Sequence, residues 1–387
     1  MTTRVLQFGT SRFLQAHADL FIHQAREAGQ DIGPITVVKT TAGTDRATRI
    51  QAFADPAGFP VQIKGYEAGQ TVDREVRVKS VARALAAHDD WDRLADIFAH
   101  GTEVVICNTG ELGFVVAAQD RDRQTPAQVP ASFPAKLLRL LRFRFDQGAA
   151  PLLILPCELI SENGRELRRI LTALAADWAE GSDFTEWMRT SVTICDTLVD
   201  RIVSQPLDPI GAVAEPYALW AIQRAPGLPE PFSHPNVVYT DDLTQFVRLK
   251  LHILNLGHSW LAARWLGEGR PPDETVREIL AEVKIRDGLL GLYRDEVVPG
   301  FAAFGMGEAA DRYVAQTIER FDNPFLNHRI GDIAQNHAVK ISHRVRAFLD
   351  WVHGADPTLD LPKLERLART PFQPPYSRSS NSRIRRW

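Results

Sequence analysis

Two short runs of almost wholly apolar residues constrain the fold more than any other part of this sequence. They are Val104–Cys107 and Leu152–Leu155. Strands of this composition are typical of a parallel sheet, because helices cover such a sheet on both faces. Residues with helical periodicity lie nearby at Trp91–Phe98 and Ala135–Phe145. Strands that alternate with helices predict βαβ units and a doubly wound α/β sheet.

The N-terminus repeats this pattern with a glycine at the first turn. Arg4–Phe8 is predicted as a strand, Gly9 as a tight turn, Phe13–Ala28 as a helix and Ile35–Val38 as the next strand. A strand, a glycine turn and a helix N-terminus form an anion site, because backbone N–H groups and the positive helix end point at a bound pyrophosphate. The N-terminal half is therefore predicted to be Rossmann-like.

The character of the chain changes near Thr240. From Asp241 onward, long helical patterns replace the strand candidates, including Asp273–Ile285, Gly307–Phe321 and Leu326–Trp351. The 387 residues are enough for two domains, each with its own core. We expect a dinucleotide-binding domain at 1–240 and a mostly α-helical substrate and catalytic domain at 241–387. The latter ends in a flexible, serine-rich basic tail.

Composition excludes several classes of protein. The formal net charge of -3 gives no reason to expect nucleic acid or an anionic membrane as partner. Three cysteines without metal-ligand spacing predict neither a disulfide framework nor a zinc site. No signal pattern and no apolar run of membrane-spanning length is found, so we expect a cytoplasmic protein. The sequence leaves the oligomeric state open.

One stretch suggests proton-transfer chemistry at an alcohol or a carbonyl. Lys250, Asn255 and His258 lie on a predicted apolar helix. On an ideal α-helix, Asn255 lies roughly 140° around the axis from Lys250, a separation that the long lysine stem can span. Lysine could serve as acid and base, asparagine as hydrogen-bond donor to the reacting oxygen, and histidine as its orienting partner. The alternative is an amphipathic helix with one surface-reaching lysine.

The pattern Lys-x4-Asn-x2-His resembles the active-site signature of the polyol-specific long-chain dehydrogenases, the mannitol dehydrogenase family. Further segments match this family in the same order along most of the chain. The resemblance implies a metal-independent oxidoreductase that uses a nicotinamide cofactor, with Lys250, Asn255 and His258 as catalytic residues. The matching segments are Gln7–Leu14, Asn108–Gly113, Pro156–Gly164, Thr197–Ile202 and, more weakly, Glu215–Tyr217.

The cofactor segment departs from the family pattern at one position. The family has Gly-x-Gly-x-Phe, whereas this chain has Ser11 at the second glycine. The resemblance favours NAD. NADP is the rival, because the second strand ends in Lys39 without the acidic residue that usually binds the ribose hydroxyl. The predicted cofactor-binding residues are Phe8, Gly9, Ser11, Arg12, Phe13, Lys39, Asn108, Thr109 and Glu111.

The substrate segment indicates a particular branch of the family. Polyol members have an asparagine where this chain has Leu159, and the form Pro-Cys-Glu-Leu-Ile-x-x-Asn-Gly resembles the tagaturonate and fructuronate reductases. Arg320–His328 points to the same branch. A hexuronate carries a carboxylate, whose recognition favours a cation. The predicted substrate-binding residues are Glu158, Asn163, Asp200, Arg201, Lys340 and Arg344.

The expected function is therefore the NAD(P)-dependent interconversion of a keto-hexuronate and its sugar-acid alcohol, with Lys250 as general acid and base. Two alternatives stay open. One is a polyol 2- or 4-dehydrogenase of the mannitol or arabinitol type. The other is a nucleotide-binding regulator that kept the fold and lost catalysis, although such a protein has no need of a proton donor.

Overall fold

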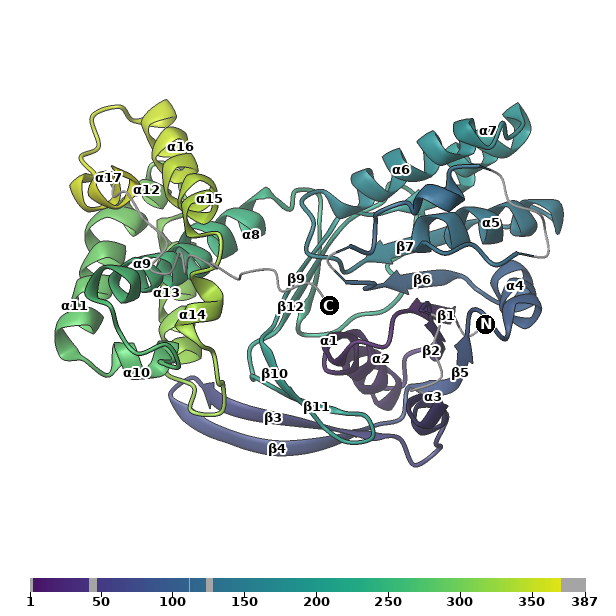
Figure 1. The fold of residues 1–387 in the computed structure, drawn as a ribbon, viewed down its shortest axis with the longest axis horizontal. Helices are drawn as coiled ribbons and strands as arrows, with labels where there is room; N and C mark the ends of the chain where they lie inside the picture. The colour runs from purple at the N-terminus through teal and green to yellow at the C-terminus, as the bar shows by residue number, and fades with distance from the viewer. Residues whose placement is uncertain (1–2, 42–46, 111, 123–127, 370–387) are drawn as a thin grey trace, which may run out of the picture. The chain divides into compact units, whose positions relative to one another are not determined.

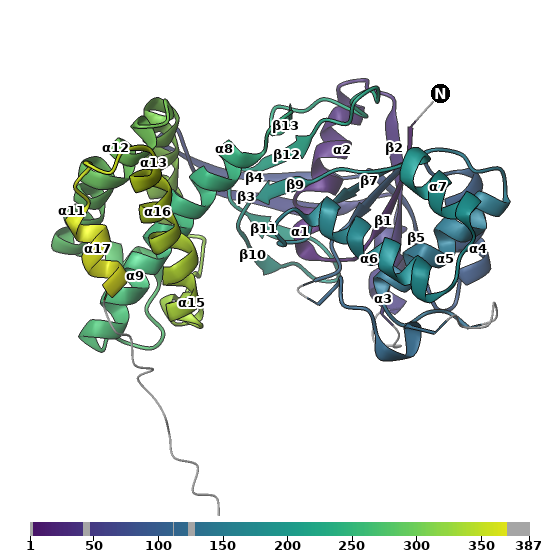
Figure 2. The same ribbon diagram turned by 90° about the horizontal axis from the view of Figure 1, so that it is seen from above.

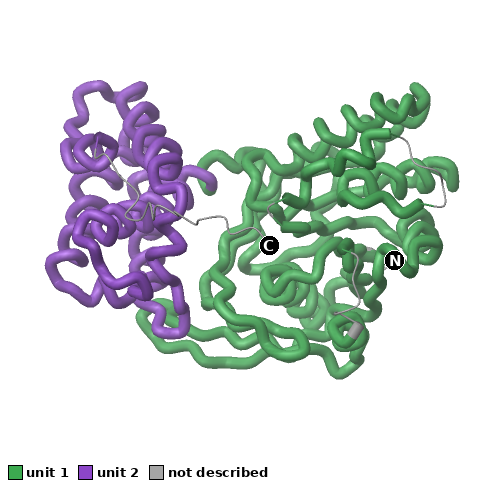
Figure 3. The backbone as a smooth tube through the Cα atoms, in the orientation of Figure 1, with its two compact units in different colours: residues 1–246 green, residues 247–387 purple. Residues whose placement is uncertain are grey.

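The computed structural model describes residues 3–41, 47–110, 112–122 and 128–369. The chain divides into two compact units, Met1–Phe246 and Val247–Trp387 (Figure 3). Each unit is described by itself below. In the described residues, no helix is long and apolar enough to cross a membrane. Glu111 and the basic tail, both named above, lie outside the described residues.

Unit 1 is built on a six-stranded parallel sheet in the order β5-β2-β1-β6-β7-β8. The first strand lies in the middle, and the chain moves outward from it first to one side and then to the other. This order confirms the predicted doubly wound sheet. The strands are β1 (Thr3–Phe8), β2 (Ile32–Lys39), β5 (Val81–Ala86), β6 (Val104–Cys107), β7 (Leu152–Pro156) and β8 (Val192–Ile194).

Successive side chains of β1 enter two different cores. Val5 packs into the cluster that includes Phe21 of α2, whereas Leu6 packs into the cluster that includes Leu138 of α5. A strand alternates its side chains between the two faces, so this sheet is buried on both sides. Figure 1 shows the helices on either side of the sheet. They are α1 (Arg12–Gln15), α2 (Ala18–Glu27), α3 (Ala47–Phe53), α4 (Trp91–His100), η1 (Ala118–Asp120), α5 (Phe133–Asp146), α6 (Asn163–Asp177) and α7 (Ser182–Ser191).

Unit 1 also contains two smaller sheets that the sequence analysis did not predict. One has the order β10-β11-β3-β4 and the other β13-β12-β9. The long β3–β4 hairpin turns at Ala68 and Gly69, both of which have positive φ. The strands are β3 (Phe59–Glu67), β4 (Gln70–Val78), β9 (Thr197–Asp200), β10 (Val203–Pro206), β11 (Ala212–Ala214), β12 (Leu219–Gln223) and β13 (Val237–Thr240).

Unit 2 is helical, as predicted, but two of the predicted long helices are interrupted. Asp273–Ile285 is divided between α10 and α11, and Leu326–Trp351 breaks at Asn336, whose φ is 54°. Helix α9 runs beside α15 (Figure 2). The α-helices are α8 (Thr244–Leu249), α9 (Asn255–Glu268), α10 (Val276–Leu280), α11 (Val283–Leu292), α12 (Val298–Ala302), α13 (Gly307–Phe321), α14 (Ile330–Ile333), α15 (His337–Ile341), α16 (Ala347–Ala355) and α17 (Pro362–Arg369).

Three π-helical turns interrupt the α-helical runs of the described part of unit 2. They are η2 (Lys250–Leu254), η3 (Tyr293–Val297) and η4 (Ser342–Arg346). Each turn is closed by a bond from a backbone N–H to the carbonyl five residues earlier, as from Asn255 to Lys250. Such turns are rare and occur frequently at functional sites. Two of the three begin at or contain a predicted site residue, namely Lys250 and Arg344.

Candidate active site

The turn after β1 has the close approach that a dinucleotide cradle needs. Gly9 has a φ of 112°, and a Cβ added there would overlap the backbone oxygen of Asn108. Its N–H donates to the carbonyl of Val38 at 2.9 Å. The turn therefore lies where the ends of β1, β2 and β6 meet, the switch point at which doubly wound sheets bind ligands. These features fit a bound nicotinamide dinucleotide.

The residues around this turn divide between core and surface. Ser11 caps α1, with its Oγ accepting from the Leu14 N–H at 3.2 Å, while Arg12 is exposed. Phe13 stacks on the ring of His17 at 4.7 Å. The Phe8 side chain is buried and packs against Phe133 at 5.3 Å, which leaves only its backbone near the turn. Lys39, at the end of β2, is buried.

The predicted residues at the ends of β6 and β7 lie together. The backbone N–H and the Oγ1 of Thr109 donate to Glu158 Oε1 at 3.0 and 3.1 Å, and the Cys107 thiol donates to Glu158 Oε2 at 3.3 Å. Asn108 Nδ2 donates to the Cys157 carbonyl at 2.7 Å. Burial raises the pKa of the Glu158 carboxyl. Glu158 therefore joins the ends of β6 and β7. The sequence analysis did not predict this structural role.

Asn163 is placed by its backbone contacts. Its Nδ2 donates to the carbonyls of Pro156 and Glu158 at 3.2 and 3.1 Å, and its Oδ1 accepts from the Thr197 N–H at 2.9 Å. The residue is 1% exposed. It begins helix α6, and Gly164 after it packs against Cys195, where a Cβ would overlap the carbonyl oxygen. In this structure Asn163 joins the loop after β7 to β9.

The buried guanidinium of Arg201 joins two segments of unit 1. Its Nε and Nη2 donate to the Glu215 carbonyl at 3.0 and 2.7 Å, and its Nη1 donates to the Ala16 carbonyl at 2.6 Å. Burial lowers the pKa of this guanidinium to about 10. Asp200 beside it is also buried. The structure thus gives Arg201 backbone partners, a role that the motif alone did not indicate.

In unit 2, the π turn η2 changes the geometry expected for the lysine motif. Asn255 donates its backbone N–H to the carbonyl of Lys250, five residues earlier. The two residues are therefore one helical turn apart rather than separated by about 140° on an α-helix. Both are partly exposed, whereas most of their neighbours on the helix are buried. The π turn brings the two side chains toward one face.

His258 lies one turn farther along α9 in a buried, cationic environment. Its ring is 4.5 Å from the ring of Phe321 and 4.8 Å from that of His328. Among the described residues, its buried Nε2 finds no hydrogen-bond partner. Burial lowers the pKa of His258 well below its ordinary value, and His328, Arg344, Arg320 and Lys340 add to the shift. The imidazole is therefore neutral at working pH and can bond a substrate oxygen.

The two predicted carboxylate ligands belong to this environment. Arg344 Nη1 donates to the Asn255 carbonyl at 3.1 Å and to Ser259 Oγ at 3.0 Å, so the guanidinium is fixed to helix α9. Lys340 Nζ donates to the Ile333 carbonyl at 2.8 Å. Burial lowers the pKa of Arg344 to about 10 and also lowers that of Lys340. A largely buried guanidinium such as that of Arg344 favours an anionic ligand.

Sequence analysis missed Arg320 as a candidate, although its motif was noted. Arg320 is 5% exposed and lies on the buried face of α13 with Tyr313, Thr317 and Phe321. The available signal was the helical spacing, because positions 313, 317, 320 and 321 form one stripe and an arginine within an apolar stripe is unusual. Ser259, which is fully buried and accepts a hydrogen bond from Arg344, was also missed, because nothing in its sequence context singles it out.

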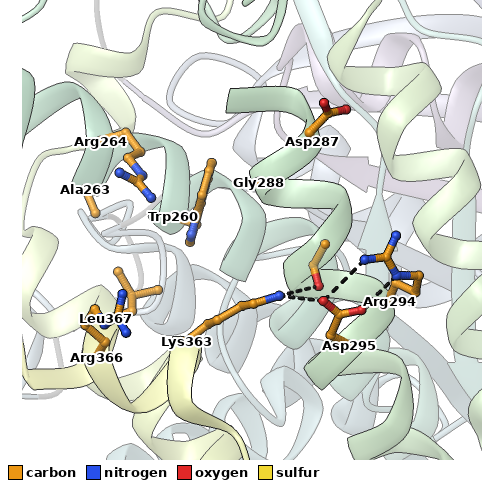
Figure 4. A pocket seen from close by; sticks show the side chains of 11 residues that line it. Trp260, Ala263, Arg264, Asp287, Gly288, Arg294, Asp295, Lys363, Arg366 and Leu367 are labelled. Atoms are coloured by element: carbon orange, nitrogen blue, oxygen red, sulfur yellow. Dashed lines mark hydrogen bonds and ion pairs between the residues drawn. The ribbon is translucent and has the colours of Figure 1, made fainter. Parts of the chain in front are cut away.

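A separate pocket of unit 2 contains none of the predicted site residues. Lys363 donates to the Gly291 carbonyl at 3.0 Å and to Asp295 Oδ2 at 2.6 Å, and Arg294 pairs with the same carboxylate (Figure 4). The lysine and arginine side chains that line this pocket are exposed, so the pocket is a surface groove. The lining residues are Trp260, Ala263, Arg264, Asp287, Gly288, Gly291, Arg294, Asp295, Lys363, Arg366 and Leu367.

Comparison with known proteins gives matches along nearly the whole chain. The Mannitol dehydrogenase Rossmann domain matches residues 3–230, and the Mannitol dehydrogenase C-terminal domain matches residues 242–358. Altronate oxidoreductase of Halalkalibacterium halodurans is 29% identical over 377 residues, covering 90% of this chain and 71% of the relative. Altronate oxidoreductase of Klebsiella pneumoniae is 30% identical over 367 residues, covering 88% and 74%. These names confirm the predicted tagaturonate and fructuronate reductase branch.

Two solved structures have the same fold at low sequence identity. D-Sorbitol dehydrogenase in substrate-free form has a TM-score of 0.75 at 18% identity, covering 90% of this chain and 76% of that one. Pseudomonas fluorescens mannitol 2-dehydrogenase, in a ternary complex with NAD and D-mannitol, has a TM-score of 0.69 at 18% identity, covering 92% and 75%. The chain therefore belongs to the mannitol dehydrogenase family and is an NAD-dependent dehydrogenase that acts on a secondary alcohol.

Proposed function

We propose that this enzyme interconverts a keto-hexuronate, of the tagaturonate or fructuronate type, and the corresponding sugar-acid alcohol. The observation that carries the proposal is the set of cations around the lysine motif of unit 2. Arg344 Nη1 donates to the Asn255 carbonyl and to Ser259 Oγ, both on α9. Burial is the largest cause of the lowered pKa of His258, and the charges of Arg344, Arg320 and Lys340 lower it further. A neutral polyol gives no reason for such a set, whereas a sugar acid does. The altronate oxidoreductases named among the relatives support this substrate class.

The catalytic roles follow from the chemistry of three side chains. When bound, NAD accepts the hydride in oxidation, and its reduced form returns it in reduction. Lys250 takes the hydroxyl proton of the alcohol in oxidation and gives a proton to the ketone oxygen in reduction. Asn255 donates a hydrogen bond to this oxygen. His258, held neutral by burial, bonds the same oxygen and orients it.

Arg344 and Lys340 are proposed to bind the substrate carboxylate. Arg344 is held by Asn255 and Ser259 through one nitrogen, so its position relative to the catalytic helix is fixed before substrate arrives. A charge-assisted hydrogen bond contributes about 1.5–3 kcal/mol. The two units divide the other predicted residues. Gly9, Ser11, Arg12, Phe13, Lys39, Asn108 and Thr109 of unit 1 are proposed to hold NAD through its phosphates and riboses, while Glu158, Asn163, Asp200 and Arg201 support these loops.

The test compares charged and neutral substrates. With NADH as reductant, we expect tagaturonate or fructuronate to exceed tagatose and fructose in kcat/KM by at least about tenfold, because each charge-assisted bond of the size above is worth a factor of ten or more. Lys340→Met should reduce this ratio. Lys284→Met, which removes an exposed lysine of the same unit, should not.

Each outcome of this comparison decides between two functions. A ratio that falls in Lys340→Met and holds in Lys284→Met supports carboxylate recognition by the cationic set. If the neutral ketoses are reduced as well as the acids by the wild type, the substrate is a polyol and the hexuronate assignment is wrong. Binding of NADH without turnover of any of the four substrates would instead favour an inactive nucleotide-binding protein.

A further inference from the structure

The three π turns in residues 247–369 of unit 2 are joined by hydrogen bonds between side chains and backbone. Tyr293, the first residue of η3, donates its hydroxyl to the carbonyl of Ile253 in η2 at 2.9 Å. His252, also in η2, bonds the carbonyl of Arg344 in η4 through Nδ1 at 3.0 Å. η2, which begins with Lys250, is therefore bonded to both of the other turns.

The Tyr293 contact depends on a glycine in the catalytic helix. Gly257 lies between Asn255 and His258, and a Cβ at this position would overlap the Tyr293 hydroxyl oxygen. The Tyr293 ring carbon Cζ would be 3.2 Å from the same Cβ. Tyr293 is 1% exposed, and burial raises the pKa of its hydroxyl, so the phenol keeps its proton and donates it to the carbonyl. The hydroxyl thus sits directly against the backbone that carries the three catalytic residues.

The hydrogen bond of His252 requires the imidazole ring to be in one protonation state. Because its partner is a carbonyl oxygen, Nδ1 must carry the proton. Burial lowers the pKa of His252 to about 4, so the ring stays neutral. The ring also packs against Phe348 at 5.2 Å and Trp351 at 6.0 Å. Since the Arg344 side chain returns to Asn255 and Ser259, the two helical segments are bonded in both directions.

We propose that Tyr293 and His252 are positioning residues for the reaction. Tyr293 fixes the π turn that presents Lys250, and His252 ties that turn to the one that presents Arg344. The proposal rests on the proposed function, which makes Lys250 the proton donor and Arg344 the carboxylate ligand. It goes further by making proton transfer and carboxylate binding depend on two buried groups that bond backbone carbonyls.

The first test removes the Tyr293 hydroxyl. Tyr293→Phe should lower kcat about tenfold and leave the KM for the keto-hexuronate within about twofold, since a small displacement of a catalytic group slows the chemical step. Tyr239→Phe is the matched control, because the Tyr239 hydroxyl also donates to a backbone carbonyl at 2.9 Å, that of Phe232 in unit 1. The control should keep kcat. Wild-type kcat in Tyr293→Phe would overturn the proposal for this residue.

The second test removes the His252 bond. His252→Phe keeps a ring against Phe348 but deletes the donor to Arg344. We expect the preference for the keto-hexuronate over the neutral ketose to fall about tenfold through a higher KM for the acid. His353→Phe is the control, because His353 bonds the Leu359 carbonyl at 3.2 Å in the same unit. An unchanged preference in His252→Phe would show that this histidine does not position Arg344.

A double substitution tests the contact between Gly257 and the Tyr293 hydroxyl. Gly257→Ala should lower kcat strongly, because the new methyl group displaces the Tyr293 hydroxyl. Adding Tyr293→Phe removes the overlapping oxygen, so the double variant should be faster than Gly257→Ala alone. Losses that simply multiply would contradict the proposed contact. Lys250→Ala in the same assay separates failure of the proposed function from failure of the positioning proposal. If Lys250→Ala retains activity, the proposed function fails. If Lys250→Ala is inactive but Tyr293→Phe has the wild-type kcat, only the positioning proposal is overturned.

Discussion

At the scale of single residues, the proposed catalytic groups of unit 2 and the buried polar groups of unit 1 differ in what identifies them. Lys250, Asn255 and His258 could be chosen from spacing and family resemblance, because the motif itself carries the information. Arg201 and Asn163 were chosen in the same way, yet their side-chain N–H groups donate to backbone carbonyls. The carbonyl of Ala16, 185 residues before Arg201, comes within bonding distance of its guanidinium only in the folded chain. A motif therefore indicates candidate residues, but it cannot show whether such a residue binds a ligand or bonds the protein's own backbone.

Cofactor choice is also decided at single residues. Lys39 was a candidate for binding a 2′-phosphate, and the structure shows it buried at the end of β2. The comparisons support NAD, in agreement with the family resemblance. Ser11 replaces the second glycine of the family pattern and uses its oxygen to cap α1. Serine is a small residue, so the departure from the pattern does not exclude a dinucleotide.

At the scale of elements, strands β6 and β7 were predictable because strands buried on both faces are continuously apolar. The β3–β4 hairpin was missed although β3 alternates buried and partly exposed residues. Its partner β4 is mostly exposed and carries charged side chains, so it lacks the apolar signal of a strand. The π turns could not be predicted at all. A π turn differs from an α-helical turn in its backbone hydrogen bonds, and its amino-acid composition does not reveal the difference.

The hairpin turn allows a prediction about stability. Ala68 has a φ of 51°, a left-handed conformation that asparagine and glycine adopt more readily than alanine. Ala68→Asn should therefore stabilise the protein by about 0.5–1 kcal/mol, and Ala68→Val should destabilise it, because β-branched residues disfavour positive φ. Urea unfolding followed by circular dichroism measures both changes. Equal midpoints for the two variants would show that the turn does not have this geometry in solution.

At the scale of the whole molecule, burial of neutral histidines couples stability to pH. Histidines in both units have pKa values lowered by burial, which means that the unfolded chain binds protons more readily than the folded one. Stability is then present above the ordinary histidine value of 6.5 and is lost as pH falls toward the folded values. The lowered pKa values are about 3 for His17 and about 4 for His234, His252, His328 and His337.

We therefore expect the melting temperature to fall as pH decreases from 6.5 to about 4. The carboxyls of Asp19, Glu158 and Asp322 oppose this trend, because burial raises their pKa values, but these three are fewer than the five histidines above. Differential scanning calorimetry across this range measures the slope. His252→Phe should make the slope shallower, since one proton fewer is then bound on unfolding. A melting temperature that is constant or rises on acidification would contradict the neutral, buried state of these histidines.

The central claim is that Lys250 carries the proton of the reaction, and the most direct measurement is the turnover of Lys250→Ala. NADH consumption with a keto-hexuronate should fall by about 10²- to 10⁴-fold, the usual effect of removing a positioned acid or base. NADH affinity, measured by fluorescence titration, should stay unchanged, and Lys284→Ala should keep full activity as an exposed control. Near wild-type turnover in Lys250→Ala would contradict the account and require another residue as the proton donor.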